Sequence, residues 1–155
     1  MNYKFTKKNK IIVFSASFHG HGEITLGVQG DEENVVESLS AGITANMVKD
    51  LIILNYSDDD ILEQIRAHKD DLAGILVEPV RSRFPDFQPK ELLHQLSELT
   101  KELDIPFIFD EIVTGFRIMP GGAQEYFDIK ADIVIYGKIA GGGMPIGIVA
   151  GSPKY

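Results

Sequence analysis

The chain contains no cysteine. It therefore forms no disulfides, holds no thiolate-bound metal and uses no cysteine nucleophile. This absence is consistent with a reducing compartment, and we expect a cytoplasmic protein. Long apolar runs are also missing, because no uninterrupted apolar stretch approaches the roughly 20 residues that a membrane helix needs. We expect no partner in the membrane.

Positively charged residues are also fewer than negatively charged ones. Lysine and arginine number 15 against 23 aspartates and glutamates, which gives a formal net charge of −8 with neutral histidine. A surface of this charge repels the phosphate backbone of a nucleic acid and the face of an anionic membrane. We therefore expect partners that are small molecules or proteins, and no nucleic acid.

The composition that remains is that of a globular chain. Of its 155 residues, 44% are hydrophobic and 25% are charged. A chain of this length buries roughly 70% of the surface that its unfolded form exposes, which is enough for a core without disulfides or metals. We expect one domain or part of one.

Apolar runs rich in β-branched residues alternate with helical patterns. Such runs predict buried strands of a mostly parallel sheet. An amphipathic helix is expected over residues 61–72, and leucines at helical spacing predict another from Pro89 to Asp104. Residues 15–50 show only weak periodicity and are too long for an ordinary loop. The pattern predicts an α/β fold with an open, mostly parallel sheet, whose ligands bind at the carboxyl ends of the strands. The runs are residues 11–14, 51–54, 74–77, 106–109, 133–136 and 146–150.

Asp110 directly follows the run 106–109, where a strand is expected to stop and a cleft to open. Three interpretations are open. Asp110 is an acid that only shapes a turn, or it forms with Glu111 the acid pair of an ATPase, or it binds the ring nitrogen of pyridoxal phosphate. The ATPase interpretation lacks its Gly-x-x-x-x-Gly-Lys-Ser/Thr loop. The pyridoxal phosphate interpretation also needs a lysine to form a Schiff base with the cofactor. Lys138 is the candidate, because the glycines at 137 and 141–143 let the backbone approach a ligand closely.

His19 and His21 offer a different chemistry. On a strand the two imidazoles would lie on one side, and Glu23 would supply a third metal ligand. Nothing else in the sequence supports such a cluster, because His68 and His94 lie on expected helices. We expect no metal.

Five motifs occur in order along the chain and together resemble the class III aminotransferases, which are pyridoxal phosphate enzymes of fold type I. Within that class, they are most similar to glutamate-1-semialdehyde aminomutase and to aminotransferase domains of polyketide and non-ribosomal peptide synthases. The motifs are residues 14–21, 77–80, 109–117, 121–127 and 137–147.

The resemblance implies a role for both central residues. Lys138 would form a Schiff base with pyridoxal phosphate and then move a proton during transamination. Asp110 would pair with the ring nitrogen of the cofactor. The implied reaction transfers an amino group from an amine donor to a carbonyl acceptor, or within one molecule as in an aminomutase.

The resemblance also assigns the residues around the cofactor. Phe18 and Ile112 would cover the two faces of its ring. His19 and Gly20 would shape the turn that carries Phe18. Glu78 would lie on the substrate side.

The resemblance further implies partners and boundaries. The segment 81–89 departs from the aminomutases and is similar to the synthase domains, whose relatives act on an acyl thioester held by a carrier protein. The complete enzyme would be a homodimer. Residues 1–155 would be part of the cofactor-binding large domain, without the N-terminal segment, the phosphate-binding turn and the C-terminal small domain, and would have little activity alone. The alternative is a non-catalytic binding module that retains the sheet.

Overall fold

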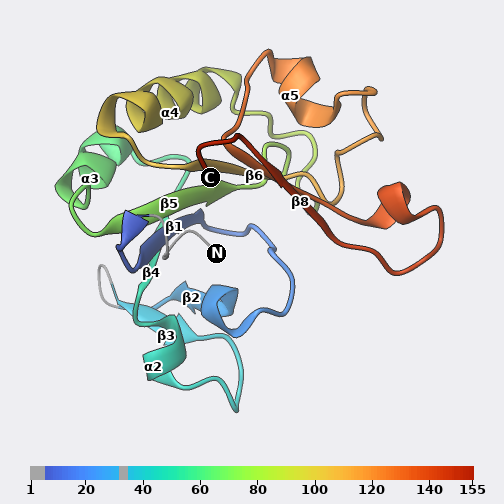
Figure 1. Ribbon diagram of the computed structural model, residues 1–155. Helices are drawn as coiled ribbons and strands as arrows, with labels where there is room; N and C mark the ends of the chain where they lie inside the picture. The colour runs from blue at the N-terminus through green and yellow to red at the C-terminus, as the bar shows by residue number, and fades with distance from the viewer. Residues whose placement is uncertain (1–5, 32–34) are drawn as a thin grey trace.

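The computed structural model describes residues 6–31 and 35–155 (Figure 1). In this part of the chain, a six-stranded sheet has the order β4-β1-β5-β6-β7-β8. The first five strands in this order are parallel to their neighbours, whereas β8 is antiparallel to β7. This arrangement confirms the α/β fold with a mostly parallel sheet. The strands are β1 (Lys10–Phe14), β4 (Leu51–Leu54), β5 (Leu72–Val77), β6 (Phe107–Asp110), β7 (Ile133–Tyr136) and β8 (Ile148–Gly151).

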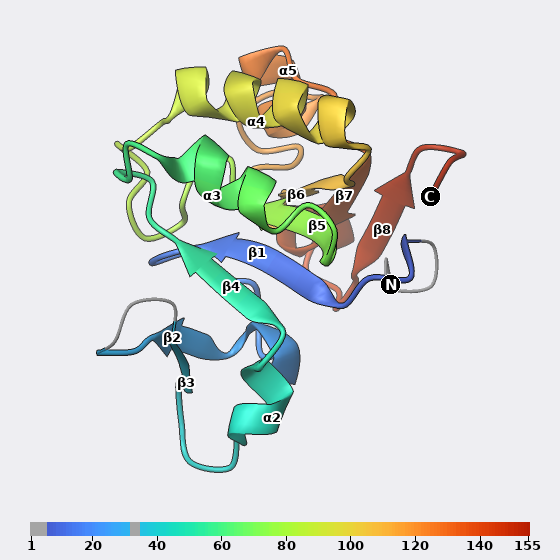
Figure 2. The ribbon, with the colours of Figure 1, turned by 90° about the vertical axis from the view of Figure 1, so that its left-hand side faces the viewer.

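The main helices lie together on one face of this sheet, as Figure 2 shows from the side. They are α3 (Ile61–Ala67), α4 (Lys90–Leu103) and α5 (Gly122–Phe127). Side chains alternate along β6: Phe107 and Phe109 join the core under the helices, and Ile108 joins a smaller cluster with Val13 and Leu76. Within the described residues, no helix is long and apolar enough to cross a membrane.

The leucine repeat forms α4 as expected. Leu93, Leu96 and Leu99 are buried against the sheet. Asp104 ends the helix in the left-handed conformation, with φ of 54°, and its N–H bonds the carbonyls of the last turn.

Residues 15–31 and 35–50 form a small layer of their own below the sheet (Figure 1). They contain the 3₁₀ helix η1 (Glu23–Thr25), the antiparallel strands β2 (Gly27–Gln29) and β3 (Val36–Ser38), and the short helix α2 (Ala45–Val48). Each element spans only three or four residues. Elements this short cannot display a period, which is why the sequence did not predict them.

Two expectations about the elements are wrong. The helix expected over 61–72 ends at Ala67, and Leu72 is instead the first, fully buried residue of β5. The run 146–150 was expected to be a buried strand, but β8 is exposed along its whole length. The chain turns back through the 3₁₀ helix η2 (Lys138–Gly141), so that β8 returns antiparallel to β7 at the sheet edge. Periodicity reports an apolar run but not whether another element covers it.

Candidate active site

The candidate residues meet at the carboxyl ends of four adjacent strands. The turn of Phe18 follows β1, Glu78 directly follows β5, Asp110 is the last residue of β6, and Lys138 follows β7. In the register of the sheet, Val77 pairs with Phe109, and Asp110 pairs with Ile135. The structure therefore brings the positions predicted from sequence to one edge of the sheet, the edge at which parallel α/β sheets bind ligands.

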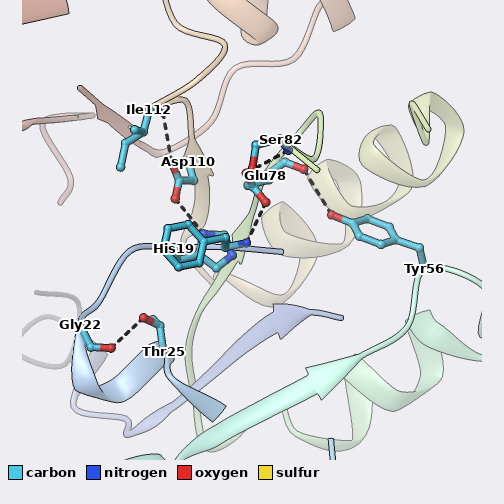
Figure 3. A network of polar contacts seen from close by, with 9 residues as sticks. His19, Gly22, Thr25, Tyr56, Glu78, Ser82, Asp110 and Ile112 are labelled. Carbon is cyan, nitrogen blue, oxygen red and sulfur yellow. Dashed lines mark hydrogen bonds and ion pairs between the residues drawn. The ribbon is translucent and has the colours of Figure 1, made fainter. Parts of the chain in front are cut away.

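His19 and Asp110 are in direct contact (Figure 3). Nδ1 of His19 lies 2.8 Å from Oδ2 of Asp110, and both side chains are 4% exposed. Oδ1 of Asp110 accepts the N–H of Ile112 at 3.1 Å. Because the imidazole faces a carboxylate, we assign the proton to Nδ1 as the donor. His19 thus holds Asp110 in place, a role beyond shaping its own turn that the sequence analysis missed.

The other histidine of this turn, His21, contacts an aromatic ring. The ring of His21 packs edge-on against Phe18, with centroids 5.4 Å apart. In the described ranges, no three side chains of His, Asp or Glu gather as metal ligands would.

Glu78 joins two loops by accepting backbone hydrogen bonds. Its buried carboxylate accepts the N–H of Phe18 at 2.9 Å and the N–H of Ser82 at 3.2 Å. The hydroxyl of Tyr56 donates to the carbonyl of Glu78 at 3.3 Å. Burial raises the pKa of Tyr56 well above its ordinary value, so this hydroxyl remains a donor. Glu78 therefore fixes the turn that carries Phe18.

Ile112 lies against the backbone that leads to Lys138. A Cβ placed on Gly137 would be 3.5 Å from Cγ2 of Ile112, an ordinary packing distance. The loop after β6 is thereby in contact with the loop after β7. This contact supports the prediction that Ile112 borders the same site as Lys138.

Lys138 has an unusual backbone and an available amine. Its φ is 47°, a left-handed value that non-glycine residues rarely adopt and that often marks functional positions. The side chain is exposed, and among the described residues its amine makes no hydrogen bond or ion pair. Gly142 and Gly143 have φ of 56° and 101°, left-handed values that glycine adopts without strain.

Glu111 faces away from this edge, although it adjoins Asp110 in sequence. It is fully buried and accepts hydrogen bonds from the Thr114 hydroxyl at 2.9 Å and from the N–H groups of Ala123 and Gln124 at 2.6 and 3.2 Å. Its carboxylate therefore provides hydrogen-bond acceptors for the free N–H groups in the first turn of α5. The two acids do not act at one place, as an ATPase acid pair would.

Comparisons with known proteins agree with this geometry. A family model described as aminotransferase class-III matches residues 1–154. The chain is 38% identical to glutamate-1-semialdehyde 2,1-aminomutase of Alkaliphilus oremlandii over 151 residues, covering 95% of this chain and 35% of that protein. It is 40% identical to the protein of the same name from Methanococcus maripaludis over 153 residues, covering 97% and 36%.

Solved structures of similar proteins share the fold. An omega-transaminase from Sphaerobacter thermophilus superposes with a TM-score of 0.86 at 28% identity, covering 99% of this chain and 37% of that one. A glutamate-1-semialdehyde aminomutase from Pseudomonas aeruginosa PAO1 superposes with a TM-score of 0.82 at 27% identity, covering 98% and 34%. A lysine-to-alanine variant of that aminomutase was solved in complex with PMP, and it matches at 26% identity with a TM-score of 0.82 over 98% of this chain and 34% of that one.

The chain spans about a third of the length of these relatives. The family model nevertheless matches nearly all of the chain, and the matched region includes every candidate residue described above. The chain belongs to the class III aminotransferase family.

Proposed function

We propose that this chain is part of the large domain of a pyridoxal phosphate enzyme that transfers amino groups. The reaction moves an amino group from an amine donor to a carbonyl acceptor, or within one molecule as in an aminomutase. The observation that carries the proposal is the buried Asp110 carboxylate, held by His19 at the strand edge next to the loop of Lys138. Class III aminotransferases are pyridoxal phosphate enzymes, and residues 1–154 match that family.

The residues at this edge fit the ring of the cofactor. A pyridinium nitrogen needs an acid, and Asp110 offers a carboxylate in a buried setting. A flat ring needs apolar cover, which Phe18 and Ile112 would supply on its two faces. A covalent attachment needs an amine that is free to react, and Lys138 has one. Gly20, with φ of 84°, allows the sharp turn after Phe18 and His19.

Each residue then has a task in the reaction. The bound cofactor would supply a protonated ring that accepts the electrons released when a bond to the reacting carbon breaks. Asp110 would hold the proton on the ring nitrogen, and His19 would hold Asp110 in that position. Nζ of Lys138 would attach the cofactor and then, once released, move a proton at the reacting carbon of the substrate. Glu78 would act from the substrate side by keeping Phe18 in place.

We further propose that the complete protein is a homodimer. Segment 81–89 would face the carbonyl acceptor, which is either a small molecule or an acyl thioester bound to a carrier protein. Exposed apolar side chains near Lys138, which include Ile139, Met144 and Ile146, support an interface beside the site.

The proposal is tested by trapping the cofactor on the chain. The purified chain is mixed with pyridoxal phosphate, reduced with borohydride, digested and analysed by mass spectrometry. We expect a cofactor adduct on Lys138, because its exposed amine is next to the ring-binding residues. Lys138→Arg should abolish this adduct, whereas the control Lys130→Arg, at another exposed lysine, should leave it unchanged. Adducts scattered over surface lysines, or no adduct, would favour a non-catalytic module.

A further inference from the structure

We propose that Arg81 is a positioning residue, which holds segment 81–89 in one conformation and, through Arg83, orients the ring of Phe18. The inference rests on the proposed function, in which Phe18 covers the cofactor ring and this segment faces the acceptor. Segment 81–89, all of which the structure describes, contains no helix or strand. Contacts of its side chains must therefore fix its shape, and those of Arg81 connect it to the sheet.

The guanidinium of Arg81 lies among three aromatic rings. Its Cζ atom is 5.0 Å from the ring centroid of Tyr56, 4.9 Å from that of Phe84 and 4.7 Å from that of Phe87. Tyr56 follows β4 in the chain, whereas the two phenylalanines belong to the segment itself. A cation within about 6 Å of the face of an aromatic ring is attracted to it, and a planar guanidinium also stacks on it. One side chain therefore joins the segment to the end of β4.

Tyr56 provides a rigid wall for this contact. Its ring stacks on that of Phe14, the last residue of β1, with centroids 4.5 Å apart. Its hydroxyl donates to the carbonyl of Glu78, directly after β5, as Figure 3 shows. Because β4, β1 and β5 are neighbours in the sheet, these contacts fix Tyr56 to three strand ends. Arg81 thus fixes the segment against the most rigid part of the fold.

The rings take the place of an ion pair for Arg81. Within the described residues, it has no carboxylate partner, and its buried Nε has no hydrogen-bond partner. Its Nη1 donates to the carbonyl of Ser15 over a long distance of 3.4 Å. Arg66, in contrast, pairs with Glu102 on the surface. A lysine could not replace Arg81, because an ammonium is compact, strongly hydrated and has no flat face.

The segment held in this way reaches the candidate site at Phe18. The guanidinium of Arg83, two residues after Arg81, lies 5.5 Å from the ring centroid of Phe18. The N–H groups of Phe18 and Ser82 bond to the same carboxylate, that of Glu78. Arg83 covers one face of the Phe18 ring, which favours the orientation that presents the other face to the cofactor. Arg81 thus acts on this ring through the segment.

The test measures amide hydrogen exchange by NMR in the 155-residue chain without any cofactor. The reporters are the N–H groups of Phe84 and Phe87, which bond to the carbonyls of Arg81 and Phe84 at 3.1 Å each. Arg81→Ala should raise their exchange rates about 10-fold, because the contacts with three rings are lost. Exchange at Leu96, buried in α4, should not change, which shows that the variant is folded. The control Arg66→Ala should leave both reporters unchanged.

Chemical rescue separates the need for a flat cation from the need for a filled space. Ethylguanidine has the atoms that Arg81→Ala removes, and it should restore slow exchange of both reporters. Propylamine, a cation of similar size without the planar group, should not restore it. For the same reason, Arg81→Lys should exchange as fast as Arg81→Ala. Unchanged exchange in Arg81→Ala, or equal rescue by the two compounds, would overturn the proposal.

A second measurement tests the connection to the candidate site. The ring current of Phe18 should shift the side-chain resonances of Arg83, and this shift should disappear in Arg81→Ala and return with ethylguanidine. A shift that persists in Arg81→Ala would overturn the proposal. The same variant should also bind pyridoxal phosphate more weakly than the unaltered chain. Failure of the unaltered chain to bind the cofactor would count against the proposed function alone, because the exchange rates and the Arg83 shift are measured without cofactor.

Discussion

At the scale of single residues, the site depends on buried carboxylates that each have different partners. Asp110 meets His19 and a backbone N–H, Glu78 meets two backbone N–H groups, and Glu111 meets a hydroxyl and two backbone N–H groups. Buried charges are tolerated only when hydrogen bonds replace water. These partners also separate the three acids by place, because Asp110 and Glu78 lie at the candidate site whereas Glu111 supports α5.

The first prediction concerns Asp110. Asp110→Asn keeps the size of the side chain but removes the negative charge that would hold a proton on the ring nitrogen. A hydrogen bond to a charged group contributes about 1.5–3 kcal/mol, so the affinity for pyridoxal phosphate should fall at least about 10-fold. An absorbance titration of the chain measures this change. The control is Asp128→Asn on the exposed surface, and equal affinities of the two variants would contradict the assigned role of Asp110.

The second prediction concerns Glu111. Glu111→Gln places an amide where three donors converge on a carboxylate, and we expect the free energy of unfolding to fall by about 2–4 kcal/mol. Urea denaturation followed by circular dichroism measures it. Glu125→Gln changes an exposed glutamate that accepts the N–H of Gly121, and this variant should stay within about 0.5 kcal/mol of the original. A loss for Glu111→Gln no larger than this control would show that the network is not structural.

At the scale of elements, helix ends show how local conformation is set. Both α4 and α5 end in an aspartate with left-handed φ, Asp104 at 54° and Asp128 at 55°. Glycine is the usual residue there, because any side chain with a Cβ is strained in this conformation. Aspartate tolerates it better than most residues do. The ends of these helices are therefore places where stability can be changed without touching the site.

The third prediction concerns the end of α5. Asp128 is exposed, and no hydrogen bond of its side chain is found within the described residues. Asp128→Gly should therefore be more stable than Asp128→Ala by about 1 kcal/mol, since only alanine has a strained Cβ at this φ. The midpoints of urea denaturation compare the two variants. Equal stability would mean that the helix ends in another conformation in solution.

At the scale of the whole molecule, several apolar side chains that follow β6 and β7 in the chain are exposed. These side chains are in the loop after β6, in the segment that joins β7 to β8, which contains Lys138, and in β8. Large exposed apolar patches are typical of interfaces, and the proposed homodimer would cover these side chains. The side chains are Phe116, Ile118, Ile139, Met144, Ile146 and Val149.

The last prediction follows from this surface. The chain should self-associate at concentrations that light scattering coupled to size exclusion detects, because apolar burial favours contact between copies. Ile146→Ser should weaken this association. Ile24→Ser removes a side chain of the same 48% exposure from η1, far along the chain from this surface, and should have no effect. A clean monomer at all concentrations would contradict the proposed interface.

Much of the fold could be predicted from the sequence, because the signals are local. Apolar runs marked all the strands of the large sheet, and the leucine spacing marked α4 from start to end. The position of Asp110 directly after a run placed it at the binding edge. The same reasoning failed at Leu72 and at β8, where an apolar residue or run has the right composition but its neighbours in space decide its structure.

By itself, the sequence determined the strands of the large sheet, helix α4 and which residues follow the strands, since these depend on neighbours in the chain. Only the tertiary structure decided that His19 meets Asp110, 91 residues away. Their strands are not even adjacent, because β5 lies between β1 and β6. The order of strands in the sheet brings these side chains together. That order depends on packing across the whole domain and is not encoded in any single segment.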